Sequence, residues 1–303
     1  MSKIKEDILI KRLVLIKYLY LTAKEQSNQV GAFAAFSILS FHDCVEMLLV
    51  LIAQQNNKKI QKHFLDYWKE IPDLQYRSEM DNLNVVRRNL KHNAIFPNKE
   101  EINRCSDDVR VFLIYNIKHY FKIDIEELLL SSLIAFDDVK EDMEKAEFFM
   151  KENHYFECLE KCKIAFMKLL YTYDTNKGLW SNSILNIGVK VNNDYRELSK
   201  SNISSDWFEQ VTQTTNCVRD VLKITALGID YRKFSLFNFI TPNVTKGSGV
   251  VGTIYVSEKK NDFEKTRTIT EQDCLFCIDF VIDSALKLQE FNFDINKYLK
   301  RKA

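Results

Sequence analysis

The hydrophobic positions in the first 130 residues recur with the period of amphipathic helices. In the first such segment, apolar side chains follow one another at steps of four, three and four: Leu9, Leu13, Ile16 and Tyr20. Similar spacing, or a longer apolar run, predicts four or five helices, over 7–25, 30–55, 58–71, 80–93 and 99–121. We therefore predict an N-terminal helical bundle.

The second half of the chain is also mostly helical in its pattern. It predicts helices over four segments: 137–151, 154–173, 205–227 and 270–289. Alternating residues on either side of a charged turn predict a β-hairpin near 249–269. The whole pattern indicates a mainly α protein, with a bundle over 1–133 and a second, mostly helical domain over 134–303 that carries the hairpin.

The composition is that of an ordered, globular chain. Only seven glycines and three prolines occur in 303 residues, of which 46% are hydrophobic and 28% charged. The formal net charge of +1 argues against a uniformly basic nucleic-acid binder and leaves room for a local basic patch. We expect no signal peptide and no membrane span, because charged residues interrupt the apolar runs. The protein is expected to be cytoplasmic.

The cysteines indicate reduced thiols. Seven is an odd number, and most lie within apolar helical patterns, which is typical of buried thiols in a cytoplasmic protein. Cys274 and Cys277 form a CxxC, but no second Cys or His pair lies near them in the sequence to complete a zinc site. The sequence also contains no glycine-rich phosphate loop, HExxH or GxSxG. We expect no metal and no cofactor.

One segment, 81–97, concentrates ionisable side chains in the sequence DNLNVVRRNLKHNAIFP. As a helix, it gathers its polar side chains on neighbouring faces: Asn84, Arg87, Arg88, Lys91 and His92. Asn93 is expected to end the helix in a left-handed conformation, so that His92 lies in the last turn. A histidine there suits either a simple interaction with the helix dipole or proton transfer near neutral pH.

The segment from Arg87 to His92 resembles the motif of HEPN domains, in which four to six residues separate an arginine from a histidine. These helical domains occur in many prokaryotic RNases, toxins and antiphage proteins. The earlier apolar stretch SILSFHDCVEMLLVLIAQ is similar to the helix that faces the motif in that family. The chain departs from the family where Arg88 follows Arg87, because an asparagine often stands there. The Arg-Asn pair is Arg88 and Asn89, only three residues before His92.

The resemblance covers residues 1 to about 130 and implies metal-independent RNA cleavage in a toxin or antiphage-defence protein, with a site shared across a homodimer. Attack of a ribose 2′-hydroxyl on the adjacent phosphate needs proton transfer and cations that stabilise the phosphorane. His92 would transfer the proton, and Arg87 or Arg88 would bind the phosphate. Asn89 and Lys91 would position the RNA. The second domain would sense a trigger, hold a regulatory or antitoxin partner, or restrain the activity.

Two carboxylates in the preceding helix are expected to support this site, together with Asn84. Asp43 and Glu46 lie in an apolar helix, where an isolated carboxylate costs on the order of several kcal/mol unless a cation pairs with it. One of them is therefore expected to face the basic helix and orient an arginine. The same arrangement fits a salt bridge that merely fixes two helices.

Two other interpretations of the chain remain open. The irregular spacing of Arg87, Arg88 and Asn89 favours a non-catalytic HEPN-like adaptor or dimerisation protein that binds a partner protein or nucleic acid. Because the motif is short, the chain is also compatible with a helical scaffold that is unrelated to the family. The remaining histidines are dispersed along the sequence and are interpreted as packed or solvated residues: His42, His63, His119 and His154.

Overall fold

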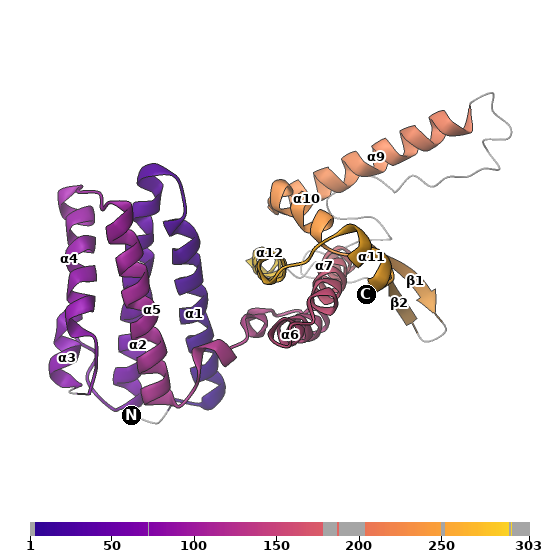
Figure 1. The fold of residues 1–303 in the computed structure, drawn as a ribbon. Coiled ribbons are helices and arrows are strands. Elements are labelled where there is room, and N and C mark those ends of the chain that lie inside the picture. Colours follow the sequence, from indigo (N-terminus) through magenta and orange to yellow (C-terminus); the bar gives the residue numbers. More distant parts are fainter. Residues whose placement is uncertain are drawn as a thin grey trace, which may run out of the picture. The chain divides into compact units, whose positions relative to one another are not determined.

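The computed structural model describes residues 4–71, 73–177, 187, 204–249, 252–290 and 292 of the chain. The fold is mainly α with one small antiparallel hairpin, which confirms the predicted fold class (Figure 1). The chain forms two compact units, Met1–Leu133 and Ile134–Ala303. Each unit is described below by itself.

The first unit is a helical bundle built around one central helix. Its elements are α1 (Glu6–Ser27), η1 (Gly31–Phe36), α2 (Ser37–Gln55), η2 (Phe64–Asp66), α3 (Tyr67–Glu70), α4 (Arg77–Asn93), α5 (Lys99–Phe121), η3 (Ile125–Glu127) and η4 (Leu130–Leu133). Helix α2 packs against α1, α4 and α5, and Figure 1 shows these long helices side by side. The central position explains why the α2 sequence is so apolar.

The helical run Gly31–Gln55 is long and apolar enough, by length and composition alone, to cross a membrane. Within the structure, 61% of its most apolar window is buried by the rest of the protein. Val45, Leu48 and Ile52 are fully enclosed. A core helix passes the same test of length and composition, so this run is weak evidence for a membrane span.

Helix α4 has the amphipathic form that its sequence predicts. Its apolar stripe is buried against the bundle: Met80, Leu83, Val86 and Leu90. The prediction that Asn93 ends the helix in a left-handed conformation is wrong by one residue, because Ala94 adopts it with φ of 53°. The Ile95 amide then donates to the Asn89 carbonyl at 3.1 Å, which satisfies an end carbonyl of the helix.

Helix α5 begins with a capping box that fixes its start beside the end of α4. The Asn98 side chain accepts from the Glu101 amide at 2.9 Å, and the Glu101 carboxylate accepts from the Asn98 amide at 3.0 Å. The Lys99 ammonium donates to the Ser27 carbonyl at 2.5 Å. This contact places the start of α5 against the end of α1.

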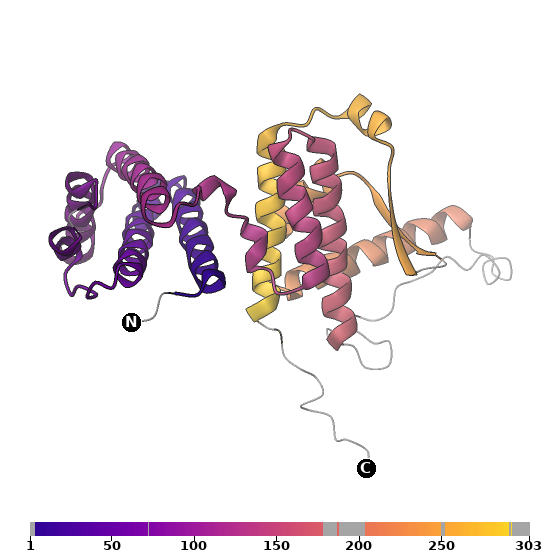
Figure 2. The same cartoon turned by 90° about the horizontal axis from the view of Figure 1, so that it is seen from below.

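The second unit is centred on a helical hairpin and the last helix. Its helices are α6 (Asp137–Lys151), α7 (Tyr155–Lys177), α9 (Ser205–Ala226), α10 (Tyr231–Ile240), α11 (Lys260–Thr266) and α12 (Glu271–Glu290). Helix α12 lies along both α6 and α7, as Figure 2 shows. The core between α7, α10 and α12 is aromatic, with the Phe237 ring 5.2 Å from that of Phe166 and 4.7 Å from that of Phe280.

The hairpin lies earlier in the chain than its sequence predicts. Strands β1 (Val244–Gly249) and β2 (Gly252–Ser257) pair antiparallel, from Val244 opposite Ser257 to Gly249 opposite Gly252. The predicted second strand over the 260s is wrong, because that segment forms α11. Helix α11 buries Phe263, which is 1% exposed, and leaves its charged residues on the outside.

Six of the seven cysteines are buried, and Cys217 on α9 is exposed. No second pair lies beside Cys274 and Cys277 in the sequence, but the fold brings Cys158 and Cys162 close to them. The Cys158 thiol interacts with those of Cys162 and Cys274, and the hydrogen bond with Cys162 is the largest of the effects that raise its pKa. These cysteines of the described structure are free thiols.

Candidate functional site

The polar side of α4 divides into an exposed part and a part that faces α2. Arg88, Lys91 and His92 are exposed on the last turns of the helix, and we call these three residues the α4 basic face. Arg88 and His92 are one turn apart, so their side chains leave the same side of the helix. Among the described residues, none of the three has a side-chain hydrogen bond or an ion pair.

The inner part of the polar side opens into a cavity of about 350 Å³, which we call the α2–α4 cavity. Helices α2 and α4 and the segment that leads into η2 line it: His42, Glu46, Lys62, His63, Phe64, Leu65, Asn84 and Arg87. Arg87 is half-buried here, so the two adjacent arginines have different surroundings. Arg88 is the arginine left on the exposed face.

His42 is the buried polar residue of this cavity. It is 2% exposed, and its ring stacks on Phe64 with centroids 4.3 Å apart. Burial, with further contributions from the Arg87 and Lys91 charges, lowers the pKa of His42 to about 4, although the Asn84 amide acts in the opposite direction. The imidazole is therefore neutral at pH 7. The Asn84 side chain is near enough to affect the pKa of the ring, but neither ring nitrogen makes a hydrogen bond of normal geometry within the described structure.

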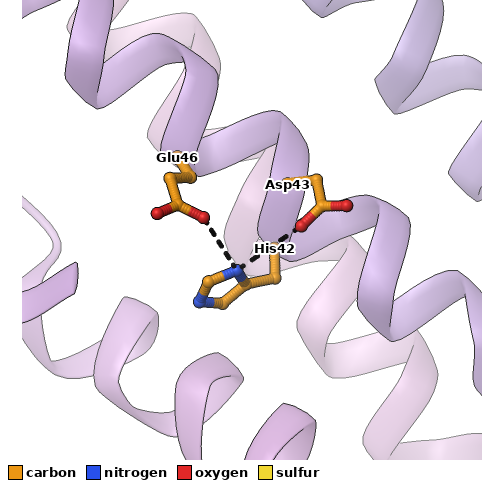
Figure 3. A group of neighbouring side chains, drawn as sticks. All are labelled: His42, Asp43 and Glu46. Atoms are coloured by element: carbon orange, nitrogen blue, oxygen red, sulfur yellow. Dashed lines mark ion pairs between the residues drawn. The ribbon is translucent and has the colours of Figure 1, made fainter. Parts of the chain in front are cut away.

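Asp43 and Glu46 gather around His42, as Figure 3 shows. The His42 Nδ1 atom lies 3.9 Å from Asp43 Oδ1 and 3.8 Å from Glu46 Oε2. Ligand atoms of the three residues lie within 4.8 Å of one another, a spacing that is compatible with a shared metal ion. The prediction that these carboxylates lie in apolar surroundings is wrong, because their side chains are 61% and 49% exposed.

A carboxylate and a motif arginine were expected to be in contact, but the structure only places them on the same cavity. Glu46 and Arg87 both line it. Among the described residues, however, no ion pair joins Asp43 or Glu46 to Arg87 or Arg88, and both carboxylates instead approach the His42 ring. An exposed carboxylate needs no buried cation, since water solvates it.

The depressed pKa of His42 predicts a loss of stability on acidification. In an unfolded chain the group titrates near pH 6.5. Between about pH 6.5 and 4 the unfolded state therefore binds more protons than the folded state, and the free energy of unfolding decreases as the pH is lowered. Between about pH 7.5 and 4.5 the expected loss is roughly 2.5 kcal/mol. Urea denaturation in EDTA at both pH values measures it.

His42→Phe is the control for this pH dependence, because phenylalanine retains the stacking on Phe64 and does not titrate. The unfolding free energy of the wild type is expected to fall by roughly 2.5 kcal/mol more than that of the variant between the two pH values. Equal pH dependence in both proteins would assign the loss to other groups around the ring, among which the charged ones are Asp43, Glu46, Arg87 and Lys91.

Sequence reasoning located α4 but not the role of His42 in the cavity. His42 and His63 were interpreted as dispersed residues, whereas both line the α2–α4 cavity. The spacing of His42 and Glu46, four residues apart, was the available signal, because it puts both side chains on one face of a helix. Asn89 is half-buried at the end of α4, where its side-chain oxygen accepts from Asn93 at 3.3 Å.

These contacts describe the candidate site from its geometry. No protein-family model, no curated protein sequence and no solved structure matches the chain.

Proposed function

We propose that the first unit is a HEPN-like, metal-independent endoribonuclease of the toxin or antiphage-defence kind. One observation carries the proposal: the α4 basic face presents two cations and an imidazole to solvent, with no protein partner for any of them among the described residues. Cations that make no internal pair are available to bind a phosphate. Because Arg87 is half-buried beside the cavity and Arg88 is exposed, we give the phosphate-binding role to Arg88.

The chemistry needs a proton to leave the ribose 2′-hydroxyl as it attacks the phosphate, and a proton to reach the departing 5′-oxygen. His92 performs one of these transfers, since imidazole exchanges protons near neutral pH. Arg88 stabilises the charge on the phosphorane through hydrogen bonds to its oxygens, and Lys91 holds the neighbouring phosphate. One α4 basic face offers one histidine, so one chain supplies half of the acid and base groups.

A homodimer would complete the site by bringing two α4 basic faces to one RNA strand. Exposed apolar side chains near this end of the bundle support such a dimer: Val30, Phe33, Phe36, Ile95 and Phe96. The contact of Lys99 with Ser27 places the two segments that carry them close together. Exposed apolar groups of this kind are typical of surfaces that another chain covers.

The second unit also carries features of an interaction module. Along α9, apolar side chains are exposed at the spacing of one helix face: Trp207, Val211, Val218 and Leu222. We propose that this stripe binds the regulatory or antitoxin partner. The exposed apolar stripe supports a role in binding, since apolar side chains of this kind are typical of surfaces that another chain covers.

Cleavage of RNA by the purified protein tests the proposal. In EDTA, the wild type is expected to cleave single-stranded RNA and leave 2′,3′-cyclic phosphate ends. Arg88→Ala is expected to lower kcat/KM on the order of 100-fold, because it removes a cation that stabilises the transition state. Arg77→Ala is the matched control, since Arg77 is exposed about three turns away on the same helix.

Equal activity of the two arginine variants would contradict the assignment of Arg88, and activity that EDTA abolishes would contradict the metal-independent mechanism. The second candidate function is a non-catalytic adaptor. The position of Arg87 favours it, because this motif arginine is half-buried beside the α2–α4 cavity and not on the exposed face with His92. A dimeric wild type that binds RNA or a partner protein but cleaves no RNA would select the adaptor.

A further inference from the structure

The proposed RNA cleavage does not explain the surroundings of the buried His42 ring. Its two nitrogens have no hydrogen-bond partner in the described structure, although the residue is only 2% exposed. Unpartnered buried polar atoms are uncommon in folded proteins because each one loses its hydrogen bonds to water. The carboxylates of Asp43 and Glu46 do not remedy this, since 3.9 Å and 3.8 Å are too long for hydrogen bonds to Nδ1.

We propose that His42, Asp43 and Glu46 bind a divalent transition-metal ion, with Zn²⁺ as the best match. The ion would lie at the mouth of the α2–α4 cavity, between Nδ1 of His42 and one oxygen from each carboxylate. Figure 3 shows both carboxylates pointing toward that nitrogen. The site is separate from the proposed cleavage chemistry and does not depend on it.

The distances fit a metal site that closes slightly on binding. Bonds of about 2.0–2.2 Å to a tetrahedral zinc ion place its ligand atoms roughly 3.3 Å apart. The two distances from His42 Nδ1 exceed this by about half an ångström, and the candidate ligand atoms lie within 4.8 Å of one another. Because the side chains of Asp43 and Glu46 are largely exposed, rotation of their torsions is free to bring the oxygens closer.

The ring, in contrast, is already held in place. Stacking on Phe64, with an interplanar angle of 29°, fixes its orientation from one side. The arrangement therefore combines one rigid nitrogen ligand with two adjustable oxygen ligands on the same helix. Since Asp43 follows His42 and Glu46 is four residues away, the regular geometry of α2 holds all three Cα positions.

The charges also match a dication. Asp43 and Glu46 supply two negative charges, which offset the repulsion from Arg87 across the cavity and from Lys91. One nitrogen and two carboxylate oxygens suit zinc and neighbouring first-row ions. His63 lines the same cavity, so the fourth position is open to its imidazole or to water.

Titration with Co²⁺ tests the site, because cobalt reports its ligands by absorption. Protein stripped with EDTA and then dialysed is expected to bind one Co²⁺ per chain at this site, with d–d bands and no thiolate charge-transfer band, and Zn²⁺ is expected to displace it. The double variant Asp43→Asn/Glu46→Gln is expected to bind at least about 100-fold more weakly. Both substitutions are at exposed positions, so circular dichroism should show an unchanged fold.

The matched control is Asp81→Asn/Glu70→Gln, which removes two exposed carboxylates outside the cluster and is expected to bind as the wild type does. Equal loss in both double variants would indicate a general charge effect and overturn the proposal. A thiolate band would place the ion on cysteine, and no binding by the wild type would reject the site. RNA cleavage in EDTA remains a separate result, since it is measured without the ion.

Discussion

His92→Ala is expected to lower the rate of RNA cleavage by about 10²- to 10⁴-fold, the usual contribution of a general acid or base. The side chain is exposed and has no partner among the described residues, so its removal should change the free energy of unfolding by less than about 0.5 kcal/mol. Single-turnover cleavage of a labelled RNA, with the protein in excess, measures the chemical step. Urea denaturation of the same variant verifies that the fold is intact.

His119→Ala is the control that separates catalysis from an interaction with the helix dipole. His119 is exposed in the last turn of α5, as His92 is in the last turn of α4. Its ring stacks on Tyr115 with centroids 5.8 Å apart, and it lies outside the α4 basic face. A similar loss of cleavage in both variants would contradict a catalytic role for His92. Its role would then be the interaction of a histidine with the dipole at the C-terminal end of a helix.

Phe237→Ala is expected to destabilise the second unit by about 3–5 kcal/mol. The ring is fully buried between the rings of Phe166 and Phe280, so its removal would leave a cavity that these aromatic side chains cannot close. Guanidinium denaturation, followed by circular dichroism, measures the change. The transition of the second unit should move to lower denaturant concentration.

Phe239→Ala supplies the comparison on the same helix. Phe239 is 67% exposed, and its ring lies 5.5 Å from the Arg267 guanidinium. Its removal should cost about 1 kcal/mol or less, since an exposed ring loses little contact. If the two variants were equally destabilised, the packing of α10 on the core of the unit would be wrong.

The helices were predictable where a local pattern decides them. The bounds of α5 and α6 agree with the periodicity, because the start of each is acidic and each has a continuous apolar face. The predicted position of the hairpin was wrong because its first strand, β1 (VTKGSG), has little of the hydrophobic alternation that identifies a strand. Helices α10 and α11 were not predicted, since they are short and derive their stability from burial of Phe237 and Phe263.

The candidate site was predictable in the same partial way. Helical spacing alone gathers Arg88 and His92 on one side of α4. Which side of α2 faces α4 depends on packing between helices, and the apolar sequence around Asp43 and Glu46 does not reveal it. The structure exposes both carboxylates and buries His42. The different surroundings of Arg87 and Arg88 have the same origin, because adjacent helical residues point about 100° apart.

The distribution of the thiols gives this protein a single exposed cysteine that can be labelled in the folded state. A maleimide dye added to the native chain would react at Cys217 on α9, since the other six sulfur atoms lie inside the two units. The dye would sit beside Val218 on the exposed stripe, so that a partner binding there would change its fluorescence. Further dye molecules would attach only after a unit opens, and the mass of the labelled protein would then give the number of buried thiols that had become exposed.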